Sequence, residues 1–416
     1  MVALIVLGVI ALLVLVIWSI KRHRDPVLRV ETEGTVAEQL PSLAGLTFGT
    51  AAPGNAVEVF ENGAFFDALL AEIAGARRSV HFETFLWKEG ALGNRLAGAL
   101  AERAEAGVAV RVLLDANGSR GIGKAAKKRL TGAGCKLAWF HPWRIWNIGV
   151  FSERDHRKIA IIDGRVAFVG GHCIVDNWLG NAQDGDHYAD VSVRLSGPAV
   201  HAIQSAFSEN WVGTTGELFM GDDVFPPLDA RGDVTIHAAF SKPEGSAPAV
   251  KILHHAAICC ARKRVWIQNP YFIPEPAAID AMGKAVSRGV DVRVLMPATS
   301  GSDNPAVQHA GHRNFEKMLR CGVRLFEYPK TLLHQKLMTV DGAWCAVGSS
   351  NFDDRSFETN DEITLGIADE GLTARFDAIF EKYAAEATEV RLDAWKRRAW
   401  SHRALDQAMY LFNELL

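Results

Sequence analysis

Cysteine is scarce in this chain of 416 residues, and its six cysteines form no recognisable pattern. Cys259 and Cys260 are adjacent, the other four are scattered, and no C-x-x-C pair occurs. The sequence therefore gives no sign of a disulfide scaffold, a zinc-binding motif or a redox motif. We expect six reduced and mostly buried thiols.

An excess of positive charge is also lacking. Lysine and arginine number 45 against 48 aspartates and glutamates, so the formal net charge is −3. This balance argues against a strongly basic surface for duplex nucleic acid. With 49% hydrophobic and 22% charged residues, the composition is that of a globular protein and excludes disorder and collagen. The length favours two or three domains.

Only one long apolar run is present, and it lies at the start. Met1 to Ile20 contains no charged side chain, and a basic cluster from Lys21 to Arg24 follows at once. About 20 helical residues span about 30 Å, the thickness of a hydrocarbon core. Because no basic segment precedes the run and no cleavage site follows it, we predict a retained single-pass anchor over 1–20 and a juxtamembrane linker over 21–45. The position of the basic cluster predicts a cytoplasmic body.

The rest of the chain contains an internal duplication. The segment Gly107–Leu114 returns as Gly289–Met296, 182 residues later, and Ala76–Val80 returns as Ala261–Val265, 185 residues later. Repeats in the same order with similar spacing predict two similar halves. We place the first half at 46–220, a connecting segment rich in proline, glycine and aspartate at 221–249, the second half at 250–390, and a basic, amphipathic tail at 391–416.

Each half alternates helix and strand signals. In the first half, 65–76, 92–105 and 124–133 have helical periodicity, whereas 80–87 and 108–114 are apolar and typical of strands. This alternation predicts an α/β fold, with a largely parallel sheet covered by helices.

A His-x-Lys-x4-Asp pattern occurs once in each half. The two copies are His156, Lys158 and Asp163, and His334, Lys336 and Asp341. Alternate residues of a strand project to the same face, so each histidine is expected to lie beside its lysine. The Asp-Gly pair that ends each copy predicts a hairpin turn.

The strand that returns after each turn ends in small residues, Gly170-Gly171 in the first half and Gly348-Ser349 in the second. Small residues allow backbone N–H groups to approach an anion. Lysine holds a phosphate as a point charge, and histidine attacks phosphorus or carries a proton. The pattern therefore indicates phosphoryl transfer.

The duplicated motif resembles that of the phospholipase D superfamily, and the surrounding sequence is most similar to bacterial cardiolipin synthases. The resemblance extends from about residue 40 to residue 400. The matching segments are His156–Ile159, Asp163–Arg165, Val169–Gly171, Ser196–Val200, Pro270–Phe272, Leu333–Lys336 and Val347–Phe357.

This resemblance implies two α/β/α halves with one active site at their interface. One histidine forms a phosphohistidine intermediate and the other acts as acid and base; by analogy we assign His156 and His334 to these roles, and leave their order open. The resemblance further implies that Lys158, Lys336, Ser349 and Asn351 neutralise the phosphoryl group, and that Asp190 and Glu362 orient the histidines. Asp163 and Asp341 belong to the motif, although a structural role in the turn fits them better. No metal or cofactor is implied, because the lysines supply positive charge.

Two positions depart from the family pattern. The asparagine expected 17 residues after the motif histidine is Asn351 in the second half but Cys173 in the first. In addition, the expected Trp-Arg-Asp is Tyr188-Ala189-Asp190 here, so an arginine is missing.

The function implied is that of a membrane-bound phosphatidyltransferase, which makes cardiolipin from two phosphatidylglycerol molecules and releases glycerol. The alternative is a phospholipase D that hydrolyses head groups to phosphatidic acid. The predicted partners are phospholipid and the bacterial inner membrane rather than nucleic acid. Since both motifs lie in one chain, a monomer is sufficient for catalysis.

Three further features allow more than one interpretation. His309 and His312 have the spacing of metal ligands on a helix, but no acidic or cysteine partner is near them in sequence, so we favour a polar helix beside the site. The segment containing Trp139, Trp143 and Trp146 fits either core packing or contact with lipid. The tail over 391–416 fits either binding to anionic lipid or packing on the body.

Overall fold

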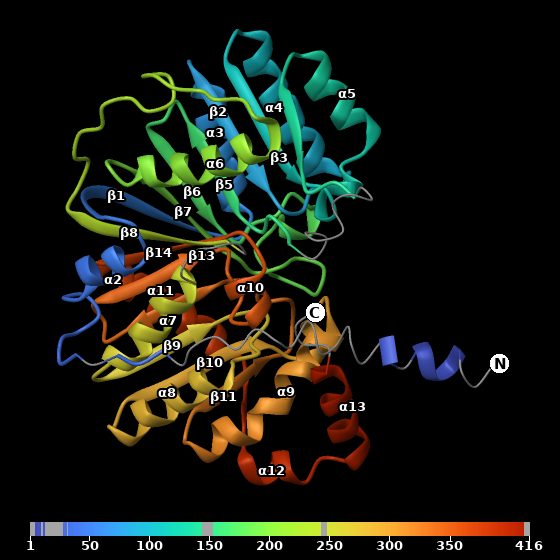
Figure 1. Cartoon of the computed structure of the whole chain (residues 1–416), viewed down its shortest axis with the longest axis vertical. Helices are drawn as coiled ribbons and strands as arrows, with labels where there is room; N and C mark the ends of the chain where they lie inside the picture. Colours follow the sequence, from blue (N-terminus) through green and yellow to red (C-terminus); the bar gives the residue numbers. More distant parts are fainter. Residues whose placement is uncertain are drawn as a thin grey trace.

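The computed structural model describes residues 5–9, 11–12, 28–30, 32–143, 153–242 and 248–411. In this part of the chain, the strands form one continuous sheet of fifteen strands with helices on both faces (Figure 1). The α/β architecture predicted from the alternating helix and strand signals is confirmed.

The sheet repeats the same strand order on each side of a central antiparallel pair, β1 (Ala51–Glu61) and β8 (Val234–Ser241). Outward from β1 the first half has β7 (Val191–Ser196), β6 (Val166–Gly170), β5 (Lys158–Ile162), β2 (Ser79–Thr84), β3 (Ala109–Asp115) and β4 (Lys136–Phe140). Outward from β8 the second half has β14 (Glu362–Ala368), β13 (Trp344–Gly348), β12 (Leu337–Val340), β9 (Arg264–Gln268), β10 (Asp291–Pro297), β11 (Arg324–Tyr328) and the edge strand β15 (Thr388–Val390). The duplication seen in the sequence is therefore a duplication of topology.

The prediction of a largely parallel sheet is wrong. Only the neighbouring strands β2, β3 and β4, and β9, β10 and β11, pair in parallel. These strands are joined through helices, whereas Asp-Gly turns reverse the chain between β5 and β6 and between β12 and β13. Asp163 and Asp341 have φ values of 53° and 56°, as a tight hairpin turn requires.

The connecting segment predicted over 221–249 differs from a simple linker. It contains β8 (Val234–Ser241), which pairs with β1 (Ala51–Glu61) on one side and with β14 on the other. Val234 to Ser241 alternates apolar and polar residues as a strand does, but it lies within a stretch rich in proline, glycine and aspartate, which predicts a linker instead. The central pair of strands thus joins the two halves into one sheet.

Helices cover the sheet in two layers. On one face, α6 (Val200–Thr215) and α11 (Glu370–Ala384) pack on a core drawn from both halves. The other face carries two separate cores. The first half is covered by α3 (Ala64–Gly75), α4 (Ala91–Glu105) and α5 (Lys124–Gly132), and the second by α2 (Leu40–Leu46), α7 (Ala249–Cys260), α8 (Pro276–Ser287) and α9 (Pro305–Arg320).

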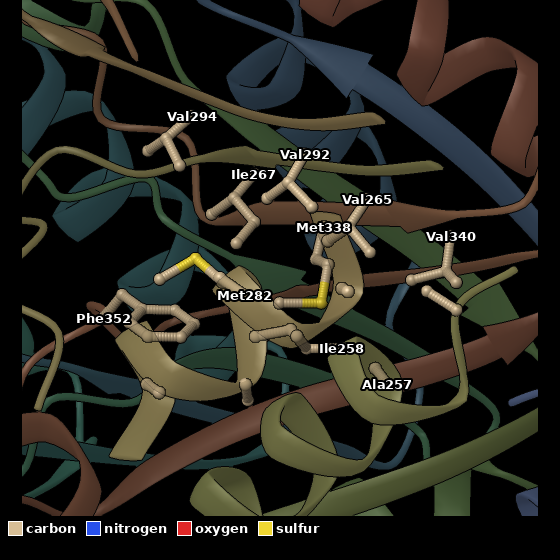
Figure 2. Close-up of a cluster of buried hydrophobic side chains, with 14 of the residues drawn as sticks. Ala257, Ile258, Val265, Ile267, Met282, Val292, Val294, Met338, Val340 and Phe352 are labelled. Carbon is tan, nitrogen blue, oxygen red and sulfur yellow. The ribbon is translucent and has the colours of Figure 1, made fainter. Parts of the chain in front are cut away.

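Figure 2 shows how the second of these cores is filled. Ile258 of α7 and Met282 of α8 lie against Val265 of β9, Val292 of β10 and Val340 of β12. Apolar residues on alternate strand positions meet the apolar stripes of the helices, and this burial fixes the sheet on which the site is built.

The remaining elements are short or lie near the C-terminus. Among the described residues, these are the 3-10 turns η1 (Gly118–Gly121), η3 (Asp176–Trp178) and η4 (Thr299–Gly301) and the α-helices α10 (Asp354–Glu358), α12 (Leu392–Lys396) and α13 (Trp400–Tyr410). Trp395 of α12 and Met409 of α13 pack on residues of α9, so the tail packs on the body at these positions, whereas Trp400 is 80% exposed.

Of the transmembrane anchor predicted over 1–20, residues 5–9 and 11–12 are described, and they are helical. The rest of the predicted anchor lies outside the described residues. Among the residues that the structure describes, no helix combines the length and the apolar composition needed to cross a bilayer. The predicted anchor is therefore not confirmed.

The aromatic segment before the first motif is described only in part. Trp139 packs against the first-half core with the ammonium of Lys127 4.7 Å from its ring centroid, and Trp143 is 68% exposed. Trp146 lies outside the described residues.

Candidate active site

The two motifs lie at equivalent positions of the two halves. Lys158 is the first residue of β5 and Lys336 directly precedes β12, with each histidine two residues earlier. The Nζ of Lys158 donates to the carbonyl of His156 at 2.6 Å, and that of Lys336 to the carbonyl of His334 at 2.8 Å. All four residues are less than one-tenth exposed. Each lysine is therefore held beside its own histidine.

Two short backbone bridges join the halves at the histidines. The N–H of His156 donates to the carbonyl of Asp361 at 2.9 Å, and the N–H of His334 donates to the carbonyl of Ala189 at 2.7 Å. These contacts are parallel bridges between Asp155 and Asp361 and between Leu333 and Ala189. In each bridge, the segment that faces the histidine continues with an acidic residue. Glu362 follows Asp361, and Asp190 follows Ala189.

Each histidine is consequently paired with a carboxylate from the other half. The Nδ1 of His156 lies 2.8 Å from Oε1 of Glu362, and the Nδ1 of His334 lies 2.7 Å from Oδ2 of Asp190. Both carboxylates are fully buried. A carboxylate on Nδ1 fixes the ring and its tautomer, and leaves Nε2 as the nitrogen for chemistry.

The two carboxylates have different surroundings. Asp190 also accepts from Nε1 of Trp178 at 2.7 Å and from the backbone N–H of Val191 at 2.8 Å. Burial opposes its charge, but the electrostatic interactions with His334 and His172 and the hydrogen bond from His334 lower its pKa to about 2. Burial raises the pKa of Glu362 to about 7, although Lys158 opposes that shift. Asp190 is therefore an anion at neutral pH, whereas Glu362 is partly protonated.

Both imidazoles are neutral in the free protein. Burial, followed by the charges of Lys158 and Lys336, holds the pKa of His156 well below its usual range. Burial and the charge of Lys336 lower the pKa of His334 to about 4, with Asp190 opposing the shift. Burial lowers the pKa of Lys336 to about 8, with a further contribution from Lys158. Such mutual effects show that the two motifs form one cluster.

Asp163 and Asp341 belong to the motif but lie outside this cluster, in the turns where the sequence favours a structural role for them. The carboxylate of Asp163 accepts from the backbone N–H groups of Arg77, Arg78 and Ser79, at distances from 2.7 to 3.1 Å. Asp341 accepts in the same way from residues 262–264. Each aspartate thus ties a hairpin turn to the chain that enters the neighbouring strand.

Gly170 and Gly171 also have a different role from the one predicted. Gly170 pairs with Ser192 in the sheet, and the N–H of Gly171 donates to the carbonyl of Val191. A Cβ on Gly170 would lie 2.0 Å from Oγ of Ser192, and one on Gly171 would lie 2.3 Å from Oδ1 of Asp190. The glycines make room for β7 and for the carboxylate of Asp190, instead of presenting the Gly171 N–H to phosphate.

The remaining predicted residues lie close to the carboxylates or the lysines. Ser349 donates from Oγ to Glu362 and therefore supports that carboxylate. The side chain of Asn351 is nearly buried, and its Oδ1 has no hydrogen-bond partner among the described residues. Cys173 is buried, and burial raises the pKa of its thiol to about 11. The thiol is thus neutral near Lys158 and Lys336.

Sequence reasoning missed two aromatic contacts and one buried arginine. The rings of Phe85 and Trp178 lie edge-on to His156 and His334, each with centroids 5.0 Å apart. Arg157 is fully buried and donates to the carbonyl of Ala206 at 2.7 Å and that of Glu362 at 3.4 Å. Arg157 could have been noticed, because it is a charged residue between the motif positions His156 and Lys158 at the start of an apolar strand. Nothing in the sequence pointed to the two aromatic residues.

Comparisons with known proteins identify the fold and the family. The fold is similar to the crystal structure of phosphatidylserine synthase from Haemophilus influenzae Rd KW20, with a TM-score of 0.69 over 91% of this chain and 99% of that one, at 13% identity. The sequence is 37% identical to cardiolipin synthase A of Pseudomonas putida over 343 residues, 81% of this chain and 69% of the relative. It is 32% identical to cardiolipin synthase 2 of Bacillus anthracis over 355 residues, 84% and 68% of the two chains.

Residues 69–211 and 255–384 match the family described as cardiolipin synthase, PLD-like domain. The chain therefore belongs to this family.

Proposed function

We propose that this chain is a phosphatidyltransferase that makes cardiolipin from two molecules of phosphatidylglycerol and releases glycerol. The observation that carries the proposal is the pair of buried neutral imidazoles, each bound through Nδ1 to a carboxylate of the opposite half. Two lysines lie beside them, as the transfer of an anionic phosphoryl group requires. The names of the relatives support the synthesis of cardiolipin.

The first step forms a covalent intermediate. Nε2 of His156 attacks phosphorus, a P–N bond forms, and the P–O bond to the glycerol head group breaks. His334, which takes up a proton from solvent once the substrate phosphate is bound, gives that proton to the leaving alkoxide, and glycerol departs. In the second step, His334 removes the proton from a head-group hydroxyl of the second phosphatidylglycerol. That oxygen attacks phosphorus, the P–N bond breaks, and cardiolipin is formed.

The carboxylates support this division of roles. Asp190 is ionised and stabilises an imidazolium at His334, as a residue that carries a proton in both steps requires. Glu362 is partly protonated and Lys158 lies next to His156, so His156 stays neutral and nucleophilic. The incoming phosphate adds negative charge between the lysines and raises the pKa of His334, which the ionised Asp190 then stabilises as the imidazolium that the first step uses.

The membrane topology of the protein and the sufficiency of a monomer are also part of the proposal. We infer that residues 1–20 anchor the protein once in the bacterial inner membrane and that the body is cytoplasmic. The uninterrupted apolar run and the basic cluster after it support this topology. Because His156 and His334 both belong to one chain, a monomer is sufficient for turnover.

The test is to incubate the purified full-length protein, in detergent micelles, with radiolabelled phosphatidylglycerol and to separate the products. Cardiolipin and glycerol in equal amounts are expected. His156→Ala and His334→Ala should each lower turnover at least 10³-fold, as is typical when one member of a catalytic group is removed. His402→Ala, on the exposed surface of α13, is the matched control and should retain wild-type turnover.

Three results would contradict the proposal. Phosphatidic acid as the main lipid product would make the enzyme a phospholipase D, because water would then be the acceptor. An absence of any product would exclude phosphatidylglycerol as the donor. Turnover at the wild-type rate in either histidine variant would exclude the proposed site.

A further inference from the structure

Two histidines and an aspartate meet where α13 packs on α9, on helices that carry neither motif (Figure 1). The Nδ1 of His309 lies 2.8 Å from Oδ1 of Asp406, and the Nδ1 of His312 lies 3.8 Å from the same oxygen. The sequence shows no acidic partner for these histidines because Asp406 lies 97 residues beyond His309. Folding of the tail supplies that partner.

The three side chains have the spacing of metal ligands. Their ligand atoms all lie within 4.8 Å of one another. In a tetrahedral zinc site with bonds of about 2.0–2.1 Å, neighbouring ligand atoms are about 3.3 Å apart. The observed separations of 2.8 and 3.8 Å lie on either side of that value. Small movements of the side chains are therefore sufficient to close the site around an ion.

The surroundings orient the ligands as they would in a metal site. Oε1 of Glu327 lies 2.9 Å from Nε2 of His312, so a carboxylate holds the ring nitrogen opposite the proposed ligand atom. This carboxylate–histidine arrangement is typical of zinc sites. Arg398 donates to Oδ2 of Asp406 at 2.9 Å and leaves Oδ1 for the ion.

Charge and burial favour a cation at this point. Asp406 is 2% exposed and His312 is 7% exposed, whereas His309 is only partly buried and provides a path for entry. Glu327 and Asp406 both lie against His312, and Arg398 donates to Asp406; with neutral imidazoles, these two carboxylates and one guanidinium carry one net negative charge. A divalent cation with neutral imidazole ligands compensates that charge in a site that is largely dry.

We propose that His309, His312 and Asp406 form a binding site for Zn²⁺ or a similar divalent transition metal, which fastens α13 to α9. The role of the ion is structural. Met409 and Tyr410 of α13 pack against Ile273 and its neighbours, and the N–H of Ile273 donates to the carbonyl of Phe352 at 2.9 Å. The fastened helix thereby supports the segment that contains Asn351.

The test uses full-length protein stripped with a chelator and titrated with Zn²⁺ in a calorimeter. The wild type should bind one Zn²⁺ per chain, and Zn²⁺ should raise its Tm. His309→Ala and Asp406→Asn should each weaken binding at least tenfold and abolish the rise in Tm. His402→Ala removes a histidine from the same helix without touching the cluster, and it should bind Zn²⁺ as the wild type does.

A second measurement covers variants that fold poorly. Co²⁺ bound to the wild type should give the visible absorption of a four-coordinate site, and His309→Ala should lose it while Tm without metal stays close to that of the wild type. The proposal is overturned if the stripped wild type binds no Zn²⁺, or if the ligand variants bind it with unchanged affinity. His156→Ala should bind Zn²⁺ normally, so this proposal and the proposed transferase activity can fail separately.

Discussion

At the scale of single residues, the site is organised by the difference between its two carboxylates. Asp190 receives hydrogen bonds from Trp178, Val191 and His334 and is ionised, whereas burial keeps Glu362 partly protonated. The imidazole beside Asp190 is therefore better suited to hold a proton. Two equivalent histidines acquire different roles through their partners.

This difference predicts unequal effects of amide substitutions. Asp190→Asn should lower kcat by roughly 10²- to 10⁴-fold, because the amide cannot stabilise an imidazolium at His334. Glu362→Gln should lower it by only about 10- to 100-fold, because the carboxyl is already partly neutral. The lipid assay measures both values. Asp163→Asn, outside the site, is the control, and a larger loss for Glu362→Gln would contradict the assignment of roles.

The lysines predict the response to alkaline pH. Burial lowers the pKa of Lys336 to about 8, so this ammonium loses its proton as the pH rises through that value. The positive charge facing the phosphate is then lost, and kcat/KM should fall about tenfold per pH unit above pH 8. In Lys336→Arg the guanidinium stays charged, so the fall should move to higher pH even if the maximum rate is lower. An unchanged pH profile in this variant would rule out Lys336 as the group responsible.

At the scale of elements, hairpins and helices position the reacting groups. The Asp-Gly turns, the strand alternation and the helical stretches 92–105 and 124–133 could be predicted, because their signals are local. The antiparallel majority of the sheet could not, because β7, β8 and β14 find their partners far along the chain. The pairing of His156 with Glu362 spans 206 residues and became visible only through the family resemblance and the fold.

The close packing of β6 on β7 gives a prediction at this scale. Gly171→Ala would place a Cβ 2.3 Å from the carboxylate of Asp190, so the carboxylate must move away from His334. Turnover should fall at least tenfold, since small displacements of a catalytic group cost that much or more. Gly98→Ala in α4 meets no atom within 4 Å, so it should keep full activity and gain about 0.5–1 kcal/mol of stability. Urea unfolding and the lipid assay measure both effects, and full activity of Gly171→Ala would contradict this role of the glycine.

At the scale of the whole molecule, one sheet carries both halves of the site. β1 and β8 pair at its centre, and the core beneath α6 and α11 is shared. The halves are therefore not independent domains joined by a tether. Relative movement between them would have to break strand pairing and a buried core, which explains how carboxylates from one half can hold histidines of the other at hydrogen-bond distance.

A site that is complete within one chain predicts the outcome of mixing inactive variants. His156→Ala and His334→Ala each lack one imidazole, and combining them should restore no activity above that of either alone. A site shared between chains would instead regain part of the wild-type rate in the mixture. The comparison is made at equal total protein in the same micelles, and recovery of activity would contradict a one-chain site.

The exchange of carboxylates between halves also bears on how the protein is made. Synthesis produces His156 and Asp190 early and Glu362 late, near the end of the second half. A nascent or prematurely terminated chain that lacks Glu362 carries an intact first motif whose imidazole has no carboxylate on Nδ1. Such a chain also lacks β14, the strand between β8 and β13, so the sheet that holds the two motifs together is incomplete. Translation itself thus delays the onset of catalysis until most of the polypeptide exists.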